Sequence, residues 1–556
     1  MCYGLYRIPN YAKNIGYGYV MAYTMSLTML KMRVKDILSL FFRKCLLTFV
    51  KKSWCNCQKS KGMIRKGIVG REYEQQLISE CCNSGKAELI AVYGRRRVGK
   101  TYLVRQMFDN HFAFFFTGMY EANRAVQLEQ FRINLQECSG TSVPKLKDWF
   151  AAFHALRQYL ETLSGERQVV VFLDELPWMD TPKSNFLQAF GYFWNTWAST
   201  MDNLKLLVCG SATTWMLSNL IGDKGGLYGR VTRQIYLAPF SLAETGQFLN
   251  GVKGMAFDRQ QVLRVYMIMG GIPYYLNMLE RGMPLDACID RLFFVQGAPL
   301  KGEFEFLFRS LFNDSKNYRR VVETLSTKMK GMTRKELVDA LKMKAGGGML
   351  TGVLENLRSC DFIRKYAAIG KSERDALYQL TDLFSLFHLR FVTNNNGQDE
   401  HFWSNLRNDG SRNAWSGYAF EQVCFHHVRQ IKKALGISGI LSNVYSWSSQ
   451  PFVDASGAKW KGGQVDMLID RADGVINLCE VKYAHDEYAI DAAYAQRLRE
   501  RESSFRVVTK TKKTLWHTFI TTYGVKQNMY SGMVNNEVTV DELFESGSSQ
   551  TTQPYL

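Results

Sequence analysis

The sequence contains no C-x-x-C pair, although its 556 residues include twelve cysteines. The cysteines are scattered, and even the close neighbours Cys55 and Cys57 do not have the usual spacing of zinc ligands. A structural zinc site and a disulfide framework are therefore not indicated. Because reduced thiols are typical of the cytoplasm, we expect a cytoplasmic protein. Histidine is also scarce, and the adjacent His426 and His427 would point apart on a helix, so we expect core or surface roles for them.

The chain also lacks an uninterrupted apolar run of about eighteen residues, the length that a membrane-spanning helix needs. Lys31, Arg33 and Lys35 divide the most apolar part of the N-terminal region. Residues 34–52 instead place apolar side chains on one face of a helix and basic ones largely elsewhere, a pattern that favours a membrane interface or a partner protein. The alternative is that translation starts at Met63, so membrane contact is expected only if residues 1–62 are genuine.

Acidic residues are nearly absent from the first 66 residues, which contain thirteen Lys and Arg but only one acid, Asp36. This segment carries +12 of the formal net charge of +19, which leaves +7 for the remainder of the chain. Since the body is only mildly basic, charge alone does not establish nucleic-acid binding. The length predicts roughly three or four domains, each able to bury a core.

The most informative motif is the stretch VYGRRRVGKT, which has the P-loop spacing G-x-x-x-x-G-K-[ST]. It follows the apolar run ELIAVY, which predicts a buried parallel strand, and it precedes a helical pattern. In such a loop, backbone N–H groups and the start of the helix face the phosphates. Lys100 would contact the β and γ phosphates of ATP, and Thr101 would bind Mg²⁺. The predicted nucleotide-binding residues are Gly94, Arg95, Arg96, Arg97, Val98, Gly99, Lys100, Thr101 and Tyr102.

The three arginines between the two glycines leave two alternatives open. Arg95, Arg96 and Arg97 either contact phosphate or lie solvated on the outer face of the loop.

Two further apolar segments end in polar side chains that suit nucleotide chemistry. The strand in QVVVFLDELPWM ends in Asp174 and Glu175, and carboxyl ends of parallel strands meet at the ligand-binding edge of a sheet. Asp174 would hold Mg²⁺ through its water shell, and Glu175 would orient or deprotonate the attacking water. A third strand ends near Ser211, which either senses the γ-phosphate or caps a helix.

The ordered motifs VGREYEQQL, VYGRRRVGKT, VFLDELPWM, LLVCGSATTWM, LYGRVTRQIYLAPFS and GGIPYYL resemble those of the archaeal-type ATPases of the AAA+/STAND branch. The resemblance covers roughly residues 64–545 and implies an AAA+-like P-loop sheet, a helical lid, a winged helix and a C-terminal nuclease-like domain. It also implies that Arg230 contacts nucleotide charge, with Arg233 as the second choice. Either arginine could instead be an ordinary surface charge.

Residues 301–392 have the pattern of a winged helix. A capping box, Thr333 with Glu336, starts one helix, and residues 349–359 form the presumed recognition helix before the polar turn GKSERD and the strand ALYQLTD. This helix offers only Arg358 for reading bases, which is poor for sequence-specific DNA recognition. A protein-docking role or contact with phosphates alone is an equally valid interpretation.

Residues 401–545 carry a second group of chemically suited side chains. Glu421 lies on a predicted helix, Asp466 on a strand, and Glu480 and Lys482 share one face of the next strand. The pattern is similar to the PD-(D/E)xK nuclease core, which implies a restriction-endonuclease-like α/β domain. In that case Asp466, Glu480 and Glu421 would bind a second Mg²⁺ or Mn²⁺, and Lys482 would assist catalysis. Such domains also serve as inactive platforms.

Taken together, these patterns predict an α/β protein in six segments. Its main expected function is Mg²⁺-dependent ATP hydrolysis that controls a region acting on DNA. The alternative is a slow ATP-dependent switch or scaffold with a protein partner and an inert nuclease fold. The oligomeric state stays open. The segments are a leader (1–62), the P-loop ATPase core (63–240), the helical lid (241–300), the winged helix (301–392), the nuclease-like domain (401–545) and a tail (546–556).

Overall fold

The computed structural model describes residues 67–222, 227–312, 314–343, 348–367, 369, 376–393, 395 and 399–545. The leader, the tail and the polar turn GKSERD lie outside these residues, so the predictions about them are not addressed. The described residues belong to one compact unit. Within them, no helix has the length and apolar character needed to cross a bilayer.

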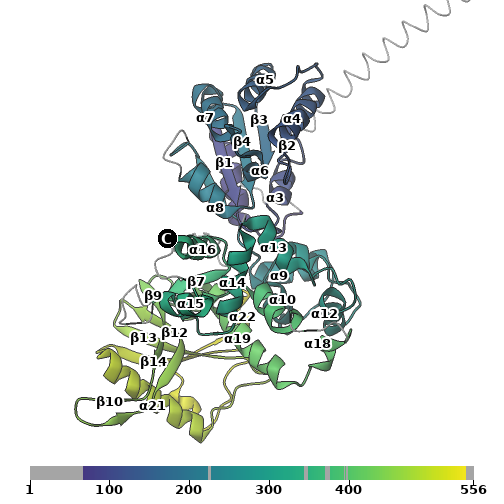
Figure 1. Cartoon of the computed structure of the whole chain (residues 1–556). Helices are drawn as coiled ribbons and strands as arrows, with labels where there is room; N and C mark the ends of the chain where they lie inside the picture. The colour runs from purple at the N-terminus through teal and green to yellow at the C-terminus, as the bar shows by residue number, and fades with distance from the viewer. Residues whose placement is uncertain are drawn as a thin grey trace, which may run out of the picture. The chain divides into compact units, whose positions relative to one another are not determined.

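A five-stranded sheet in the order β2-β3-β4-β1-β5 forms the first part of the chain (Figure 1). All neighbouring strands run parallel, so the strands' carboxyl ends share one edge. Every residue of the central strands is buried, which explains why these strands are apolar except for Glu88, Asp174 and Lys205. The strands are β1 (Glu88–Tyr93), β2 (Phe114–Thr117), β3 (Val169–Asp174), β4 (Leu204–Gly210) and β5 (Arg233–Tyr236).

Helices cover both faces of this sheet because successive side chains of β1 point to opposite sides. Ile90 and Val92 pack in one core with helices α2 and α3. Leu89 and Ala91 pack in the other, where Phe131, Trp149 and Phe186 bring three helices together. The first pair is α2 (Glu72–Cys82) and α3 (Lys100–Met107), and the other three helices are α4 (Arg124–Ser139), α5 (Trp149–Glu161) and α7 (Phe186–Thr196). A short helix α6 (Leu176–Met179) precedes α7, and another, α8 (Thr213–Trp215), follows β4.

A helical region follows the sheet, as the sequence predicted. The Ser241–Glu244 capping box starts α9, and Gly270 ends α10 in the left-handed conformation. The helices of this region are α9 (Leu242–Gly246), α10 (Arg259–Met269), α11 (Pro273–Leu276), α12 (Leu285–Phe293) and α13 (Glu303–Leu311).

The next region alternates helices with a small antiparallel sheet in the order β6-β8-β7. Its predicted capping box of Thr333 and Glu336 is present at the start of α15. The elements, in chain order, are α14 (Ser315–Ser326), β6 (Met332–Thr333), α15 (Arg334–Leu341), α16 (Gly348–Ser359), β7 (Ile363–Tyr366), β8 (Leu377–Leu380) and α17 (Leu383–Phe387).

A second five-stranded sheet, in the order β15-β14-β13-β12-β9, forms the C-terminal part. Strands β9, β12 and β13 are antiparallel neighbours, and β14 then runs parallel to β13 after the crossover helix α21. The predicted helix and hairpin are both present. The main elements are α18 (Phe402–Asn405), α19 (Gly410–His426), α20 (Val428–Ala434), β9 (Ser442–Ser449), β12 (Gly463–Arg471), β13 (Val475–Lys482), α21 (Ala492–Thr509), β14 (Thr514–Thr521), β15 (Asn536–Thr539) and α22 (Val540–Leu543), with a short hairpin of β10 (Phe452–Val453) and β11 (Lys459–Trp460).

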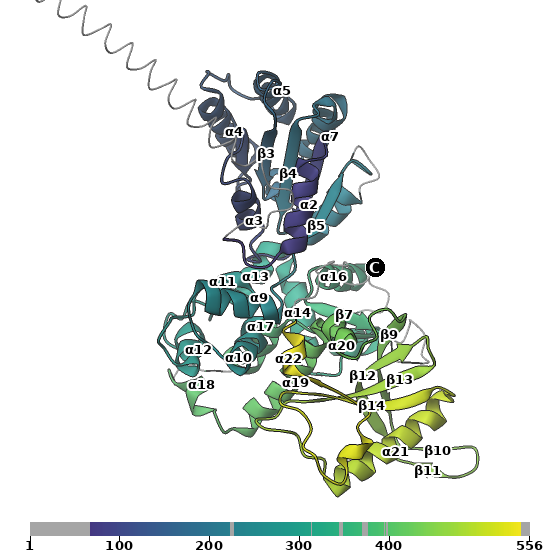
Figure 2. The same cartoon turned by 180° about the vertical axis from the view of Figure 1, so that it is seen from behind.

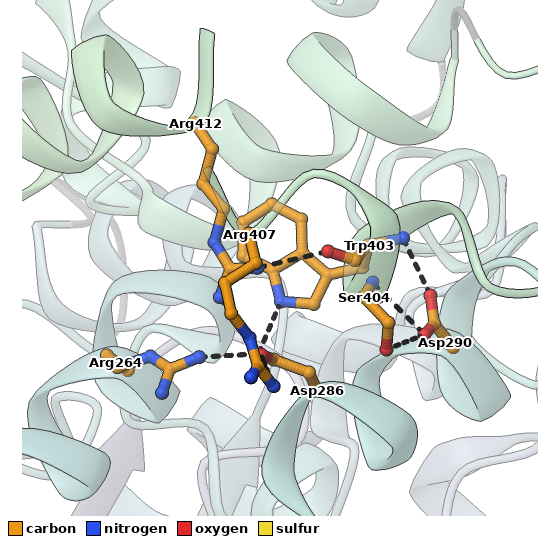
Figure 3. Close-up of polar contacts among 7 residues, drawn as sticks. All are labelled: Arg264, Asp286, Asp290, Trp403, Ser404, Arg407 and Arg412. Carbon is orange, nitrogen blue, oxygen red and sulfur yellow. Dashed lines mark hydrogen bonds and ion pairs between the residues drawn. The ribbon is translucent and has the colours of Figure 1, made fainter. Parts of the chain in front are cut away.

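Two buried aspartates of α12 hold the helical region against α18 and α19. Both overall views show α18 beside α12 (Figures 1 and 2). Asp286 accepts hydrogen bonds from Arg412 at 2.8 Å and from the Trp403 indole at 3.1 Å, and Arg264 and Arg407 also reach it (Figure 3). Because charged groups this deeply buried need partners, this cluster fixes the position of the C-terminal helices. Asp290 completes it by accepting from the backbone N–H groups of Trp403 and Ser404.

Candidate nucleotide site and a second acidic cluster

The P-loop lies between β1 and α3, at the carboxyl edge of the first sheet. Gly94 has a φ of 145°, and a side chain there would clash with the Leu237 carbonyl at 2.3 Å, so only glycine fits. Lys100 is buried, and its ammonium donates to the carbonyl oxygens of Gly94 and Arg95, both at 3.0 Å. Burial lowers the pKa of Lys100. The acceptors of the Lys100 ammonium are thus neutral carbonyl oxygens. A bound phosphate would take their place as a charged and stronger acceptor.

Asp174 and Thr101 meet beside the loop. The Thr101 hydroxyl donates to Asp174 Oδ2 at 2.9 Å, which joins the start of α3 to the end of β3. Burial, followed by the neighbouring Glu175 carboxylate, raises the pKa of Asp174 to about 6. The buried carboxylate and the hydroxyl together provide two oxygen ligands of the kind that a hard cation prefers.

Glu175 and Ser211 form the next pair along the same edge. The Glu175 backbone is left-handed, with φ of 49°, directly after β3. Its Oε2 accepts from the Ser211 hydroxyl at 2.8 Å and from the Ser211 backbone N–H at 3.1 Å. Ser211 follows β4 and is fully buried. The predicted acid and the predicted phosphate sensor are thus brought together, with the serine orienting the carboxylate.

Comparison with known families identifies this part of the chain. Residues 68–279 match the family described as an ATPase domain predominantly from Archaea. This part of the chain is an archaeal-type ATPase domain. The match contains the P-loop, Asp174, Glu175 and Ser211.

Relatives and solved structures are also similar to this chain, over spans of different length. An uncharacterized protein of Methanocaldococcus jannaschii is 24% identical over 369 residues, which cover 66% of this chain and 78% of that protein. An uncharacterized ATP-binding protein of the same organism is 45% identical over 43 residues, which cover 8% of this chain and 73% of that protein. The Walker-type ATPase of Pyrococcus abyssi has a TM-score of 0.43 and 18% identity, covering 60% of this chain and 99% of that one. The ORC2 protein of Aeropyrum pernix has a TM-score of 0.38 and 12% identity, covering 60% and 96%.

The residues of the ATPase domain fit Mg²⁺, which usually takes one or two protein oxygens together with water and nucleotide phosphates. Thr101 and Asp174 offer a hydroxyl and a carboxylate oxygen 2.9 Å apart. A larger ligand set is not needed. In the part of the chain that the structure describes, no cluster of three or more His, Cys, Asp or Glu side chains is arranged to hold a metal ion.

Two P-loop arginines follow neither interpretation made from the sequence. Arg95 is buried and forms an ion pair with Asp382, with its guanidinium 4.7 Å from the Phe362 ring centre. Arg97 pairs with Glu303 at 2.8 Å and lies 4.0 Å from the Tyr274 ring centre. Both side chains therefore join the phosphate loop to later parts of the chain, because carboxylates that the sequence places far away lie against the loop.

The other predicted nucleotide contacts are less central. Arg230 is exposed in a turn that precedes β5, and Arg233 pairs with Ile90 in the sheet, about 10 Å along β1 from the P-loop end. The sheet register therefore places Arg233 away from the P-loop of its own chain. Tyr102 is exposed, and its hydroxyl donates to the Gly67 carbonyl at 3.0 Å.

The second acidic cluster lies on the C-terminal sheet. Met467 pairs with Cys479 in the antiparallel register of β12 and β13. Burial, followed by the neighbouring Glu480 carboxylate, raises the pKa of Asp466, so the two carboxylates lie close together. Lys482 is on the same face of β13 as Glu480, two residues further on. Desolvation raises the pKa of Glu421 to about 8, and the Asp466 carboxylate is the next cause. The four predicted residues are thus brought together.

Glu480 is already neutralised by side chains that the sequence analysis did not single out. Its carboxylate lies 2.5 Å from the Arg501 guanidinium, accepts from the Tyr494 hydroxyl at 2.7 Å, and lies 3.7 Å from Lys482 Nζ. Glu480 is only 1% exposed. Since both of its oxygens are engaged, the cluster as it stands does not fit a divalent cation. Arg501 lies in QRLRERE on α21, and its helical spacing from Tyr494, seven residues apart, was the available signal.

Proposed function

We propose that the chain is an ATP-driven switch, in which the nucleotide state of the ATPase domain controls the winged-helix-like and C-terminal α/β regions. The observation that carries this proposal is the pair of contacts from the P-loop to later parts of the chain. Arg95 pairs with Asp382, and Arg97 pairs with Glu303. A loop that binds phosphate cannot change its shape without moving these partners.

The chemistry of the switch is ATP hydrolysis by residues at one sheet edge. Lys100 exchanges two backbone carbonyls for phosphate oxygens, which are stronger partners. A bound Mg²⁺ would be held by Thr101 and Asp174 and would neutralise phosphate charge. Glu175, oriented by Ser211, accepts the proton of the attacking water. Ser211 holds the Glu175 carboxylate in place. The rate of hydrolysis therefore depends on whether the hydrogen bond between Ser211 and Glu175 is kept or broken.

A protein-docking role suits the region of residues 301–392 better than base reading. The order of helices and strands from α14 to β8, with its three-stranded antiparallel sheet, supports a winged helix. Its presumed recognition helix, α16, packs against α8 of the ATPase domain. Arg358 pairs with Glu355 at 2.9 Å, so the predicted base-reading cation already has a partner.

Turnover and the effect of DNA test this proposal. We expect purified full-length protein to bind ATP, to hydrolyse it slowly, and to ignore added DNA. Glu175→Gln should bind ATP and leave it uncleaved, whereas Glu166→Gln, an exposed carboxylate before β3, should match the parent. Fast turnover that DNA stimulates would instead favour a motor acting on DNA.

A second candidate function, metal-dependent cleavage of DNA, is favoured by the C-terminal sheet. The order α19, β9, β12, β13, α21 and β14, with β14 parallel to β13, agrees with a restriction-endonuclease-like fold. Glu480 and Lys482 share one face of β13, and Asp466 lies near both of them. Against cleavage stands the engagement of Glu480 by Arg501 and Tyr494, which favours an inert platform.

A nicking assay with Mg²⁺ or Mn²⁺ separates the two interpretations. An active nuclease would lose nicking in Asp466→Ala and in Lys482→Ala, would be weakened less in Glu421→Ala, and would keep ATP hydrolysis in all three. Intact DNA across metals and nucleotides would establish the platform.

A further inference from the structure

Arg95, the residue after the first P-loop glycine, is tied to a helix far away in the sequence. Its guanidinium forms a buried ion pair with Asp382, 287 residues further along the chain. Asp382 is the N-cap of α17, and its second oxygen accepts from the Ser385 backbone N–H at 2.9 Å. One carboxylate therefore holds both the start of α17 and the phosphate loop.

Lys100 is joined to the same point of the loop. Its ammonium donates to the carbonyls of Gly94 and Arg95, on either side of the Arg95 Cα. When a nucleotide phosphate binds the Lys100 ammonium, these two hydrogen bonds must break. The backbone that carries the Arg95 side chain is then freed at the moment of binding, so occupation of the site acts directly on the ion pair.

Helix α17 contacts both the helical region and the C-terminal region, so a shift of its N-terminus would affect both. Phe384 stacks on Tyr275 of α11, with ring centres 4.7 Å apart. Phe387 packs edge-to-face with Trp403 of α18 and Trp415 of α19, with ring centres 5.1 Å and 5.5 Å apart. The same helix thus packs against the lid and against the first helices of the C-terminal region, and packed interiors respond to a shift as a unit.

The ion pair is incompletely satisfied, which makes it easy to displace. Within the described residues, Arg95 Nε and Nη2 are buried and have no hydrogen-bond partner. Buried donors without acceptors are unfavourable, and so the resting arrangement has no large excess of stability over an alternative one. The neighbouring Asp361 accepts from the Tyr236 hydroxyl, and burial raises the pKa of Asp361 to about 7, so this carboxyl is only partly ionised beside the guanidinium.

We infer that the Arg95–Asp382 ion pair restrains the P-loop in its nucleotide-free shape, and that ATP binding releases it and loosens α17. This regulation rests on the proposed switch. Because coupling is reciprocal, a contact that ATP weakens must itself oppose ATP binding by the same factor. Breaking the pair should therefore tighten ATP binding and remove the response of α17.

Asp382→Asn is the variant that isolates the charge, because asparagine still caps a helix. Arg95→Met combined with Asp382→Asn leaves no unpaired buried charge, so it serves if the single variant folds poorly. Glu303→Gln is the matched control, since it breaks the other P-loop ion pair, that of Arg97, and does not touch α17's N-cap.

The test combines ATP titration calorimetry with amide hydrogen exchange of residues 383–392 in the full chain. In the parent, ATP should speed exchange in this segment. Asp382→Asn and the double variant should bind ATP about tenfold more tightly and exchange alike with and without ATP. Glu303→Gln should keep the exchange response.

Three results separate the possible failures. If the parent binds no ATP, the proposed switch fails along with this inference. If the parent binds ATP and its residues 383–392 exchange at an unchanged rate, the coupling alone is wrong. The coupling is also wrong if both charge-removing variants fold and bind ATP with the parent's affinity or more weakly.

Discussion

The P-loop edge of the ATPase sheet and the acidic face of the C-terminal sheet contain similar side chains, but they hold their carboxylates differently. At the first, Asp174 and Glu175 accept hydrogen bonds from neutral donors of Thr101 and Ser211. At the second, Glu480 faces the guanidinium of Arg501. A carboxylate that is held by a neutral hydroxyl can exchange this donor for a metal ion at little cost in free energy. A carboxylate that is held by a guanidinium must first give up a charged partner, which competes with the metal ion.

The lysines of the two regions differ in the same way. Lys100 holds backbone carbonyls, which a phosphate displaces readily. Lys482 lies 3.7 Å from Glu480 and beside the Tyr494 ring. Similar residue types therefore predict a working site only where their resting partners can be exchanged.

The largest effect should come from Glu175→Gln, which changes the carboxylate at the P-loop edge of the ATPase sheet. Glutamine keeps the size and can still accept from Ser211, but it cannot take a proton from water. We expect hydrolysis to fall by about 10²–10⁴-fold with ATP affinity retained, as measured by single-turnover assays. Hydrolysis at the parental rate would assign proton transfer to another group.

Lys100→Ala should have the next largest effect. It removes the ammonium from the phosphate site, and losing one partner of a buried charge contact costs about 2–5 kcal/mol, or at least about thirtyfold in affinity. Calorimetric titration with ATP measures this loss. Lys86→Ala, in the exposed loop before β1, is the control and should bind like the parent. Equal affinity in both variants would be incompatible with the P-loop site.

Arg501→Met removes the guanidinium that faces Glu480 on the C-terminal sheet and so tests whether this ion pair neutralises the acidic cluster. It leaves the buried Glu480 with only the more distant ammonium of Lys482 to balance its charge, so we expect a loss of about 3 kcal/mol in the stability of this region by urea denaturation. Adding Glu480→Gln should restore much of the loss because no buried charge then remains. Parental stability in Arg501→Met alone would show that the ion pair does not neutralise the cluster.

The smallest effect concerns His427, which lies between the two regions. Its Nε2 accepts from the Leu242 backbone N–H at 3.1 Å, and its Nδ1 donates to the Val423 carbonyl at 2.8 Å, so only the neutral ring fits. Burial lowers the pKa of His427 from 6.5 to about 4.

The sign of the pH effect follows from this depressed pKa. Between pH 6.5 and about 4 the unfolded chain takes up a proton that the folded chain refuses, so stability falls as the pH falls. We expect the loss of stability between pH 7.5 and pH 5.5 to be about 1 kcal/mol smaller in His427→Gln than in the parent. Chemical denaturation at the two pH values measures it, and equal slopes for parent and variant would contradict the account.

Much of the ATPase domain follows from the sequence because its signals are local. The strand Glu88–Tyr93 has the predicted bounds, and the capping boxes of Ser241 and Thr333 are present. Asp174 and Glu175 could be assigned because parallel strands bring their carboxyl ends to one edge. The face shared by Glu480 and Lys482 followed from strand alternation.

Side-chain partners across long sequence separations could not be predicted in the same way. Nothing near Arg95 indicates Asp382, because the contact depends on how α17 packs, although the spacing of Asp382 and Ser385 is typical of a helix N-cap. The partnership of Glu480 with Arg501 likewise depends on how the crossover helix packs on β12. Charge patterns show which groups need partners but do not say which partners they find.

Amide hydrogen exchange across residues 402–545 tests the central claim most directly. The protein would be Glu175→Gln, which holds ATP without cleaving it, compared with the same variant free of nucleotide. The account predicts that ATP changes exchange in α18 and α19, which contact α17, as well as in the P-loop. A change confined to residues 68–279 would contradict it, because the nucleotide state would then not reach the C-terminal region.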